Sequence, residues 1–327
     1  MHLLLFNIYD SIRLLGWHGA FELLRDGIVL GALYSLVALG YTLVYGILKL
    51  LNFAHGDVFM VGAFIGFGVL SVLGGPLNAV LSTVPLILVM FAVSMLGSGV
   101  LGVVIERFAY RPLRNAPRIA PLISALGVVF FLESAVQLIT NSSHSQYLFY
   151  PVYQSLISPA FTVTISGVVE PISVIAIVVV ATAIALMLAL MLLVNRTRLG
   201  KAMRATAFDR EAASMMGIDT DRVISATFFI GSALAGAAGV MYGLYNSDTY
   251  YLVGFAFGLK AFTAAVIGGI GSIEGAMLGG VLVGLVENFA GGYAGGQWRD
   301  IVVFGMLILF LLVRPTGLLG KHAIQKV

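Results

Sequence analysis

Charged residues are scarce in this sequence: 18 Lys and Arg and 15 Asp and Glu make up only 10% of 327 residues. Soluble domains carry about 25% charged residues, so a water-soluble globule of this length could not cover its surface. Apolar residues make up 60% of the chain, and the mean hydropathy is +1.02. Disordered chains combine low hydrophobicity with high charge, so disorder is excluded as well. The composition predicts a protein whose solvent is lipid.

Cysteine is absent altogether, which excludes a disulfide framework, a thiolate metal site and a thiol nucleophile. No basic patch is interleaved with aromatic residues, so we expect no nucleic-acid partner. The sequence also lacks a Gly-x-x-x-x-Gly-Lys-[Ser/Thr] phosphate loop, because the nearest string, from Gly317 to Lys321, has the wrong spacing. We therefore predict no metal, no cofactor and no ATP site in this chain.

Long apolar runs are abundant, and a membrane-spanning helix needs about 20 such residues. The runs predict an all-α, polytopic integral membrane protein with about eight or nine spanning helices, at 24–46, 57–75, 80–106, 119–140, 171–194, 223–245, 255–272, 274–291 and 298–314. The seventh and eighth meet at Gly268-Gly269-Ile270-Gly271, which equally fits broken or re-entrant helices that line a protein cavity.

The chain divides into three parts on the same grounds. Residues 1–23 are predicted to form an interfacial amphipathic segment, because Asp10 interrupts the apolar start and no basic region precedes it as in a signal peptide. Residues 24–320 form the predicted transmembrane domain, and 321–327 a cytoplasmic tail.

Basic residues predict the orientation. Most of them lie in 107–118, in 195–222 and in the C-terminal tail, whereas 141–170 and 246–254 contain none. Lys and Arg accumulate in cytoplasmic loops, so the three basic segments are placed inside and the N-terminus outside. The segment 141–170, rich in Ser, Tyr and Pro, is predicted to be a structured loop on the outer side.

Small residues recur at four-residue spacing, which aligns them on one helix face. Such stripes let two membrane helices approach closely, and a functional variant would let helices slide during gating. The predicted packing stripes are Gly231, Ala235, Gly239 and Gly243 on one helix and Gly271, Gly275 and Gly279 on another.

A faint internal echo links two distant segments. Residues 53–56 read Phe-Ala-His-Gly and residues 255–258 read Phe-Ala-Phe-Gly. Inverted repeats are typical of transporters, and a chance match in glycine-rich helices is the alternative.

The basic segment 195–222 contains the most informative loop. Good helix formers fill 204–216, Gly217 is suited to a left-handed helix end, and the next four residues include capping candidates for the following helix. Met215 and Met216 lie near the end of the predicted short amphipathic helix. Methionine adapts to irregular contact surfaces, so this helix is either a docking element for a partner or a solvated connection.

Glu211-Ala212-Ala213, followed after three residues by Gly217, resembles the cytoplasmic loop of ABC importer permeases. The stretches 31–46, 51–57 and 258–272 are more specific and resemble the H-type permease of high-affinity branched-chain amino-acid transporters. The resemblance covers most of 24–320. The Ile-x-Leu-Pro ending of other importer loops is missing after Gly217.

This resemblance implies a multi-pass permease, not an enzyme, in a bacterial inner membrane. It implies a second, M-type permease as a heterodimeric partner, two subunits that bind ATP and Mg²⁺, and a periplasmic binding protein that delivers leucine, isoleucine or valine. The residues that it places in the ATPase-coupling loop are Arg204, Asp209, Glu211, Ala212, Ala213 and Gly217.

Ionisable and polar residues within membrane helices are costly, and we treat them as functional candidates. The gate or pathway candidates are Asn52, His55, Asp57, Glu133 and Glu287. For the first three, pairing across the pore mouth, holding a helix break and capping the helix remain open. For the two glutamates, structural pairing and contact with the cargo remain open. Lys260 is expected to extend to the outer interface, and Tyr245, Tyr250 and Tyr251 to form an outer aromatic belt or the rim that meets the binding protein.

Other functions remain as alternatives. A urea or short-amide permease of the same family would share these motifs. An ion-coupled secondary transporter would carry carboxylates deep in several helices, and neither it nor a passive channel would need a docking loop.

Overall fold

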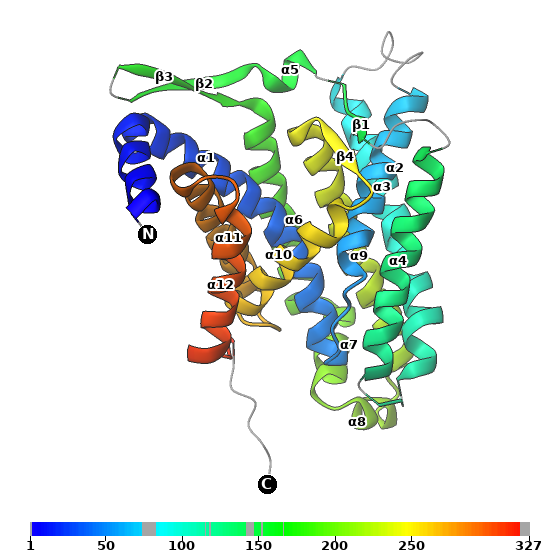
Figure 1. Cartoon of the computed structure of the whole chain (residues 1–327). Coiled ribbons are helices and arrows are strands. Elements are labelled where there is room, and N and C mark those ends of the chain that lie inside the picture. The colour runs from blue at the N-terminus through cyan, green and yellow to red at the C-terminus, as the bar shows by residue number, and fades with distance from the viewer. Residues whose placement is uncertain are drawn as a thin grey trace.

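The computed structural model describes residues 2–73, 83–114, 116–117, 119–141, 147–151, 153–165 and 167–320, and it consists mostly of helices (Figure 1). The predicted tail, 321–327, lies outside the described residues. In chain order the elements are α1 (His2–Leu48), α2 (His55–Leu73), α3 (Thr83–Ile105), η1 (Glu106–Tyr110), η2 (Arg111–Leu113), α4 (Ile119–Asn141), β1 (Tyr147–Phe149), α5 (Gln154–Ile157), β2 (Pro159–Ile165), β3 (Val168–Ser173), α6 (Val174–Arg196), α7 (Arg198–Phe208), α8 (Arg210–Met215), α9 (Thr220–Asn246), β4 (Asp248–Tyr250), α10 (Val253–Gly268), α11 (Ile273–Ala294) and α12 (Trp298–Val313).

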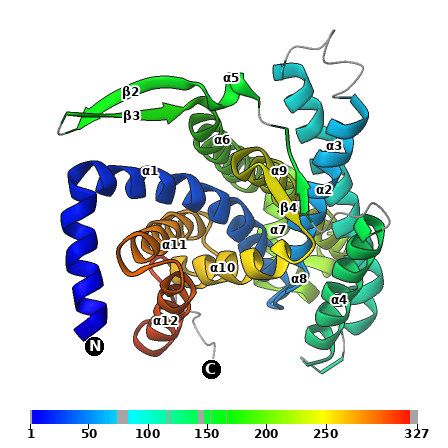
Figure 2. The same ribbon diagram turned by 45° about the horizontal axis from the view of Figure 1, so that its top comes forward.

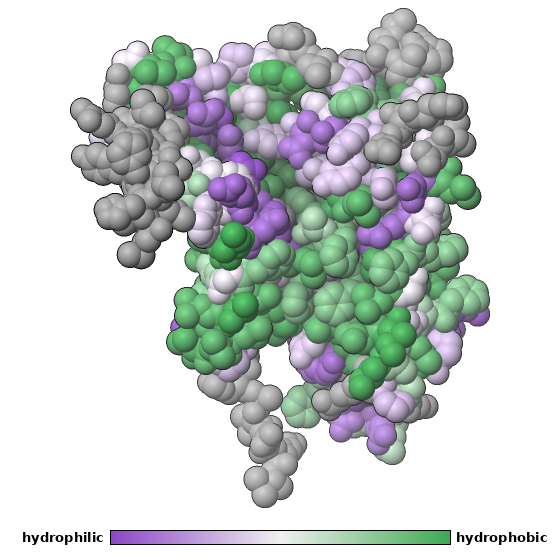
Figure 3. Space-filling view, in the orientation of Figure 1, coloured by the Kyte–Doolittle hydropathy of each residue, from purple (hydrophilic) through white to green (hydrophobic). Residues whose placement is uncertain are grey.

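Seven helices in the described ranges are long and apolar enough to cross a membrane, which confirms the all-α membrane fold. They are Gly19–Leu48, His55–Leu73, Val84–Leu113, Ile119–Thr140, Val174–Arg196, Thr220–Asn246 and Ile273–Ala294. The other two predicted spans form α10 and α12, of 16 residues each. At 1.5 Å per residue such a helix is about 24 Å long, shorter than the ~30 Å hydrocarbon core. The surface shows an apolar band between two polar ends (Figure 3).

The helices differ in how much of them faces the surrounding lipid. α1 and α9 form the centre of the molecule: 89% and 78% of the residues in their 18-residue apolar stretches are buried. α4 and α6 lie at the periphery, with 22% and 17% buried. α1 packs mainly against α11 and α9, and a kink at Gly16 (φ 55°) turns its first residues away from the spanning part (Figure 2).

α2 begins inside the molecule rather than at its cytoplasmic end. The chain leaves α1 at Leu48 and runs without helix to residue 54, so that His55 lies beside Gly40. Gly40 precedes the end of α1 by eight residues, a rise of about 12 Å. Asn52, His55 and Asp57 therefore lie at or just before the start of α2, the inner end of this helix as expected, and their role as gate or pathway residues stays a prediction. They occupy a helix break in the protein interior, where protein surrounds the irregular backbone as membranes require.

The outer segments contain strands that the sequence pattern did not indicate. β2 and β3 form an antiparallel hairpin, and β1 pairs with β4, which lies about 100 residues further along the chain. Figure 2 shows the hairpin extending over α6 and α1. Tyr150, directly after β1, inserts between α2 and α9, where its hydroxyl donates to the Ala63 carbonyl (2.5 Å). The described part of 141–170 is therefore structured as predicted, and its place on the outer side stays a prediction.

Most of the predicted glycine stripes pack helices as expected. Gly231 faces α1 at Gly40, and Gly239 faces the α2 backbone at Phe59 and Ala63. Gly275 and Gly279 lie against the last turns of α10. Gly271 is an exception: its φ of +99° places it in the turn between α10 and α11, outside the helix.

The α10–α11 turn is held by the last described residues. The amides of Leu318 and Leu319 donate to the carbonyls of Ile267 (2.8 Å) and Gly268 (3.0 Å). These two carbonyls end α10 and lack partners within their own helix. The segment after α12 thus closes the cytoplasmic end of α10. The structure contains two helices here, separated by a glycine turn.

Candidate functional site

The cytoplasmic loop forms two short helices instead of the single one predicted. α7 ends at Phe208, and α8 starts after Asp209, whose carboxylate accepts a hydrogen bond from the Ala212 amide (3.0 Å). An aspartate in extended conformation is a strong helix N-cap, so Asp209 separates the helices and starts the second. The sequence pattern missed this break because the surrounding residues all favour helix.

Gly217 ends α8 as predicted. Its φ is +83°, and its amide donates to Ser214 while the Ile218 amide donates to Ala213. This pair of bonds is the Schellman arrangement that closes a helix with a left-handed residue. Asp219 then caps α9 by accepting from the Arg222 amide (3.1 Å), which confirms the predicted capping segment.

The loop presents an apolar surface to the cytoplasm. Phe208, Met215 and Met216 are 82%, 87% and 83% exposed, and Glu211 and Ala212 are also exposed. Ala213 is buried against the rest of the protein. We call the group of Phe208, Glu211, Ala212, Met215 and Met216 the loop surface. Exposed methionines on a rigid, capped helix are suited to contact with a partner.

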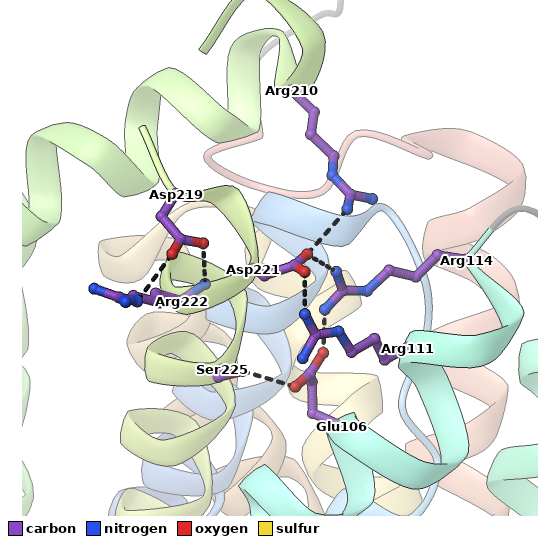
Figure 4. Close-up of polar contacts among 8 residues, drawn as sticks. All are labelled: Glu106, Arg111, Arg114, Arg210, Asp219, Asp221, Arg222 and Ser225. Carbon is purple, nitrogen blue, oxygen red and sulfur yellow. Dashed lines mark hydrogen bonds and ion pairs between the residues drawn. The ribbon is translucent and has the colours of Figure 1, made fainter. Parts of the chain in front are cut away.

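An ion-pair network attaches the loop to the end of α3 (Figure 4). Asp221, at the start of α9, pairs with Arg111, Arg114 and Arg210. Arg114 also pairs with Glu106, and both side chains are almost completely buried, with 6% and 1% exposed.

The network continues beyond these ion pairs. Ser225 donates to the second carboxylate oxygen of Glu106 (2.7 Å), so both oxygens of this buried group are occupied. Arg204, at the other end of the loop, donates to the Val194 carbonyl of α6. The loop is therefore fixed to α3, α6 and α9 at once, and a displacement of its surface would reach all three helices.

A polar cavity of about 420 Å³ lies at the opposite, outer side. This volume falls in the range of small-molecule sites. Polar side chains gather on this part of the molecule in Figure 3. The lining residues come from α1, α9, α10, α11, α12 and β4, and include Asp26, Leu30, Tyr34, Tyr242, Tyr245, Tyr250, Val253, Phe257, Lys260, Glu287 and Arg299. We call it the outer cavity.

The floor of the outer cavity carries a buried ion pair. Lys260 contacts Glu287 (2.7 Å) and Asp300 (2.7 Å), and the Tyr34 hydroxyl donates to Glu287 (2.7 Å). The side chains of Lys260 and Glu287 are 14% and 5% exposed. Lys260 therefore bridges the buried Glu287 and the 66% exposed Asp300, and its extension to the outer interface stays a prediction. Glu287 is thus both structurally paired and at the cavity wall.

The aromatic residues around the cavity have different roles. Tyr245 donates to Asp26 (3.3 Å), and Tyr250 lines the wall, where burial raises the pKa of its phenol. Both therefore take part in the cavity rather than in a lipid-facing belt. Within the cavity wall, the rings of Tyr34 and Phe257 lie 4.5 Å apart, and Phe257 stacks on Phe59 at 4.3 Å.

A second cavity of about 540 Å³ lies at the cytoplasmic side, lined by Lys49, Arg204, Gly271 and Glu274 among others. Tyr34 on α1 borders the outer cavity, and Lys49, directly after the end of α1, borders the inner one. The fourteen helical residues between them rise over about 21 Å. Packed side chains of this part of α1 and of α10 separate the two cavities, and neither cavity was predictable from the residue pattern.

The helix-break candidates lie between these cavities. His55 and Asp57 are 1% and 0% exposed, and within the described residues none of their side-chain nitrogens and oxygens has a hydrogen-bond partner. Asn52 accepts from the Tyr110 hydroxyl (3.0 Å). Glu133 is half-buried on α4, which is on the opposite side of the molecule from α11 (Figure 1). The structure therefore does not bring Glu133 and Glu287 together.

Comparisons with known proteins agree on one family. The model of the family "Branched-chain amino acid transport system / permease component" matches residues 23–311. The high-affinity branched-chain amino acid transport system permease protein BraD of Pseudomonas aeruginosa is 43% identical over 308 residues, 93% of this chain and 97% of that protein. The corresponding LivH of Escherichia coli K12 is 41% identical over 303 residues, 92% of this chain and 96% of LivH. A probable LivH of Methanocaldococcus jannaschii is 26% identical over 306 residues. No solved structure matches the chain.

Proposed function

This chain belongs to the family of branched-chain amino acid transport system permease components, and we propose that it forms part of the membrane pathway of an ATP-driven importer. The cargo is leucine, isoleucine or valine. The observation that carries this proposal is identity of 41–43% to permeases of such systems over more than nine-tenths of the chain. The chain is a multi-pass protein of the inner membrane.

The energy for transport comes from other subunits in this proposal. Two ATP-binding subunits dock on the loop surface and carry ATP and Mg²⁺. The exposed Met215 and Met216 and the capped α8 support this assignment, because they combine an adaptable apolar contact with a fixed backbone. Glu211 contributes a negative charge to the same surface. A second, M-type permease completes the pathway, and a periplasmic binding protein delivers cargo to the outer side.

The alternatives fit less well. Relatives named for branched-chain amino acids favour that cargo over urea or short amides. An ion-coupled carrier would have no use for a fixed cytoplasmic loop tied to three helices.

Competition for uptake tests the cargo. The complete transporter, with its binding protein, is reconstituted in vesicles that contain ATP, and the entry of labelled leucine is measured. We expect unlabelled isoleucine and valine to suppress entry and urea or acetamide to have no effect. Entry of labelled urea, unaffected by leucine, would overturn the proposed cargo.

A further inference from the structure

We propose that the outer cavity is a transient binding site for the zwitterionic head group of an aliphatic amino acid, with Arg299 as the carboxylate ligand and Asp26 as the ammonium ligand. This inference rests on the proposed function and assigns chemistry to a cavity within it. The argument depends on which charged groups in the cavity are already paired and which are available.

The charged groups at the floor of the cavity already have partners within the protein. Lys260 has two carboxylate partners, Glu287 and Asp300, and Glu287 uses its other oxygen to accept from Tyr34. Breaking a buried pair by removing one partner costs several kcal/mol because the other charge stays behind unpaired. The floor therefore acts as a fixed polar base and not as the ligand for the cargo.

Arg299 is the available cation. It lines the cavity from the start of α12, its side chain is exposed, and among the described residues no carboxylate lies within ion-pair distance of it. A guanidinium presents paired N–H groups whose geometry matches a carboxylate. The α-carboxylate of an amino acid would supply the missing partner.

Asp26 is the available anion. Its Oδ1 accepts from Arg25 (2.9 Å) and from Tyr245 (3.3 Å), whereas within the described residues its Oδ2 has no partner. Oδ2 can accept from an ammonium group without breaking either bond. Among the described lining residues, the wall thus offers a guanidinium without a carboxylate partner, on Arg299, and a carboxylate oxygen without a donor, on Asp26, whose other oxygen pairs with Arg25. This pattern suits a zwitterion better than a neutral amide.

The remaining wall suits an aliphatic side chain. Leu30 and Tyr34 follow Asp26 at four-residue intervals and therefore lie on the same face of α1. Val253 and Phe257 form the matching stripe on α10. A branched hydrocarbon chain can rest between these stripes while the head group stays at the charged end, so the cavity would accept the cargo without enclosing it.

The absence of cysteine allows a direct test of binding. Ala256 is exposed and lines the cavity, so the Ala256→Cys variant places a single thiol there. The complete transporter carrying this variant is reconstituted without binding protein and without ATP, and a membrane-impermeant thiol reagent is added to the outer side. The rate of modification of this chain is followed by gel shift. A control variant, Thr162→Cys, carries its thiol on the exposed hairpin away from the cavity.

We expect leucine at ten times its Kd to slow modification of the Ala256→Cys thiol about tenfold and to leave the Thr162→Cys thiol unaffected. Leucinol, which lacks the carboxylate, and 4-methylpentanoate, which lacks the ammonium, should protect much less. Adding Arg299→Gln should abolish protection by leucine, whereas adding Arg222→Gln, an exposed arginine on the other side of the membrane, should not.

Three results would overturn the proposal: no access of the reagent to the cavity thiol, no protection at millimolar leucine, or equal protection by all three compounds. The measurement uses neither ATP nor binding protein. Uptake of leucine by the unmodified transporter, measured separately, tells whether the permease function holds when the head-group site does not.

Discussion

Arg114 connects two parts of the cytoplasmic network that differ in burial. Its pair with Glu106 is enclosed, whereas Asp221 is 38% exposed. Exposed ion pairs contribute at most about 1 kcal/mol because water and salt screen them. Loss of one partner from a buried ion pair is strongly destabilising, because the other charge stays buried without a partner. The stability of the loop attachment should therefore depend on a single arginine.

Arg114→Gln should destabilise the protein by about 3–5 kcal/mol, because the Glu106 carboxylate would remain buried with only Ser225 as partner. Arg210→Gln removes a 3.4 Å contact of an exposed guanidinium and should cost less than about 1 kcal/mol. Denaturant unfolding of the two variants in the same detergent measures the difference. Equal losses of stability would contradict the assigned roles.

Some residue positions were predictable and others were not. Gly217 and Asp219 were predictable because a helix end depends on a few neighbouring residues. The burial of Lys260 was not, since its partners lie 27 and 40 residues further along the chain on two other helices. Arg299 and Asp26 gave no signal for the same reason: their relation exists only after α1 and α12 have packed around one cavity.

At the scale of elements, the break before α2 depends on its crossing with α10. A Cβ on Gly56 would lie 2.4 Å from the Gly254 carbonyl oxygen and 2.8 Å from Cα of Gly258. The two segments that echo each other in sequence, 53–56 and 255–258, therefore meet at this crossing. The small residues that produced the echo are needed for close approach of two backbones, which accounts for the match without requiring a repeat.

Gly56→Ala should destabilise the protein by about 1–3 kcal/mol, because the added methyl group meets backbone atoms that cannot rotate away. Gly68→Ala is the matched control on the same helix, where an added Cβ meets nothing within 4 Å. The control should be neutral or more stable by up to about 1 kcal/mol, because alanine favours helix over glycine. Thermal unfolding in detergent compares them, and a neutral Gly56→Ala would refute the close crossing.

The helices themselves followed from apolar runs of sufficient length, and the strands did not. β1 pairs with β4, which lies about 100 residues further along the chain. The β2–β3 hairpin consists mostly of exposed residues, with little alternation between buried and exposed positions. The path of 49–54 back into the interior was also unpredictable, because a short polar connection looks the same in sequence whether it lies inside or outside the membrane surface.

Glu211 is the charged residue of the loop surface, and its replacement tests whether this surface couples ATP hydrolysis to uptake. Glu211→Ala should lower leucine uptake about tenfold or more while ATP hydrolysis continues, because it alters the proposed docking surface without removing an ion pair or side-chain hydrogen bond to any other described residue. Lys201→Ala is the control, an exposed charged residue of α7 that lies outside the loop surface and lines neither cavity. Uptake and ATPase rates are measured on the same vesicles. Unchanged uptake with Glu211→Ala would count against docking at this surface.

At the scale of the whole molecule, the two ends of the helix bundle differ in the charged groups and elements that they carry. The cytoplasmic end carries the basic segments and the loop surface, and the outer end carries the strands and the charged cavity (Figures 1 and 3). The sides on which the few basic residues lie could be predicted from the sequence, because lysine and arginine accumulate in the cytoplasmic loops of membrane proteins. The cavities could not, since their walls come from five helices or from distant loops.

The central claim is that ATP hydrolysis by partner subunits, acting through the loop surface, moves amino acid past the barrier between the two cavities. The most direct test is leucine uptake by vesicles that contain this chain alone or the complete transporter, with and without ATP and with and without an ion gradient. We predict uptake only for the complete transporter with its binding protein and with ATP on the side of the loop surface. Uptake by this chain alone, driven by an ion gradient without ATP, would contradict the account.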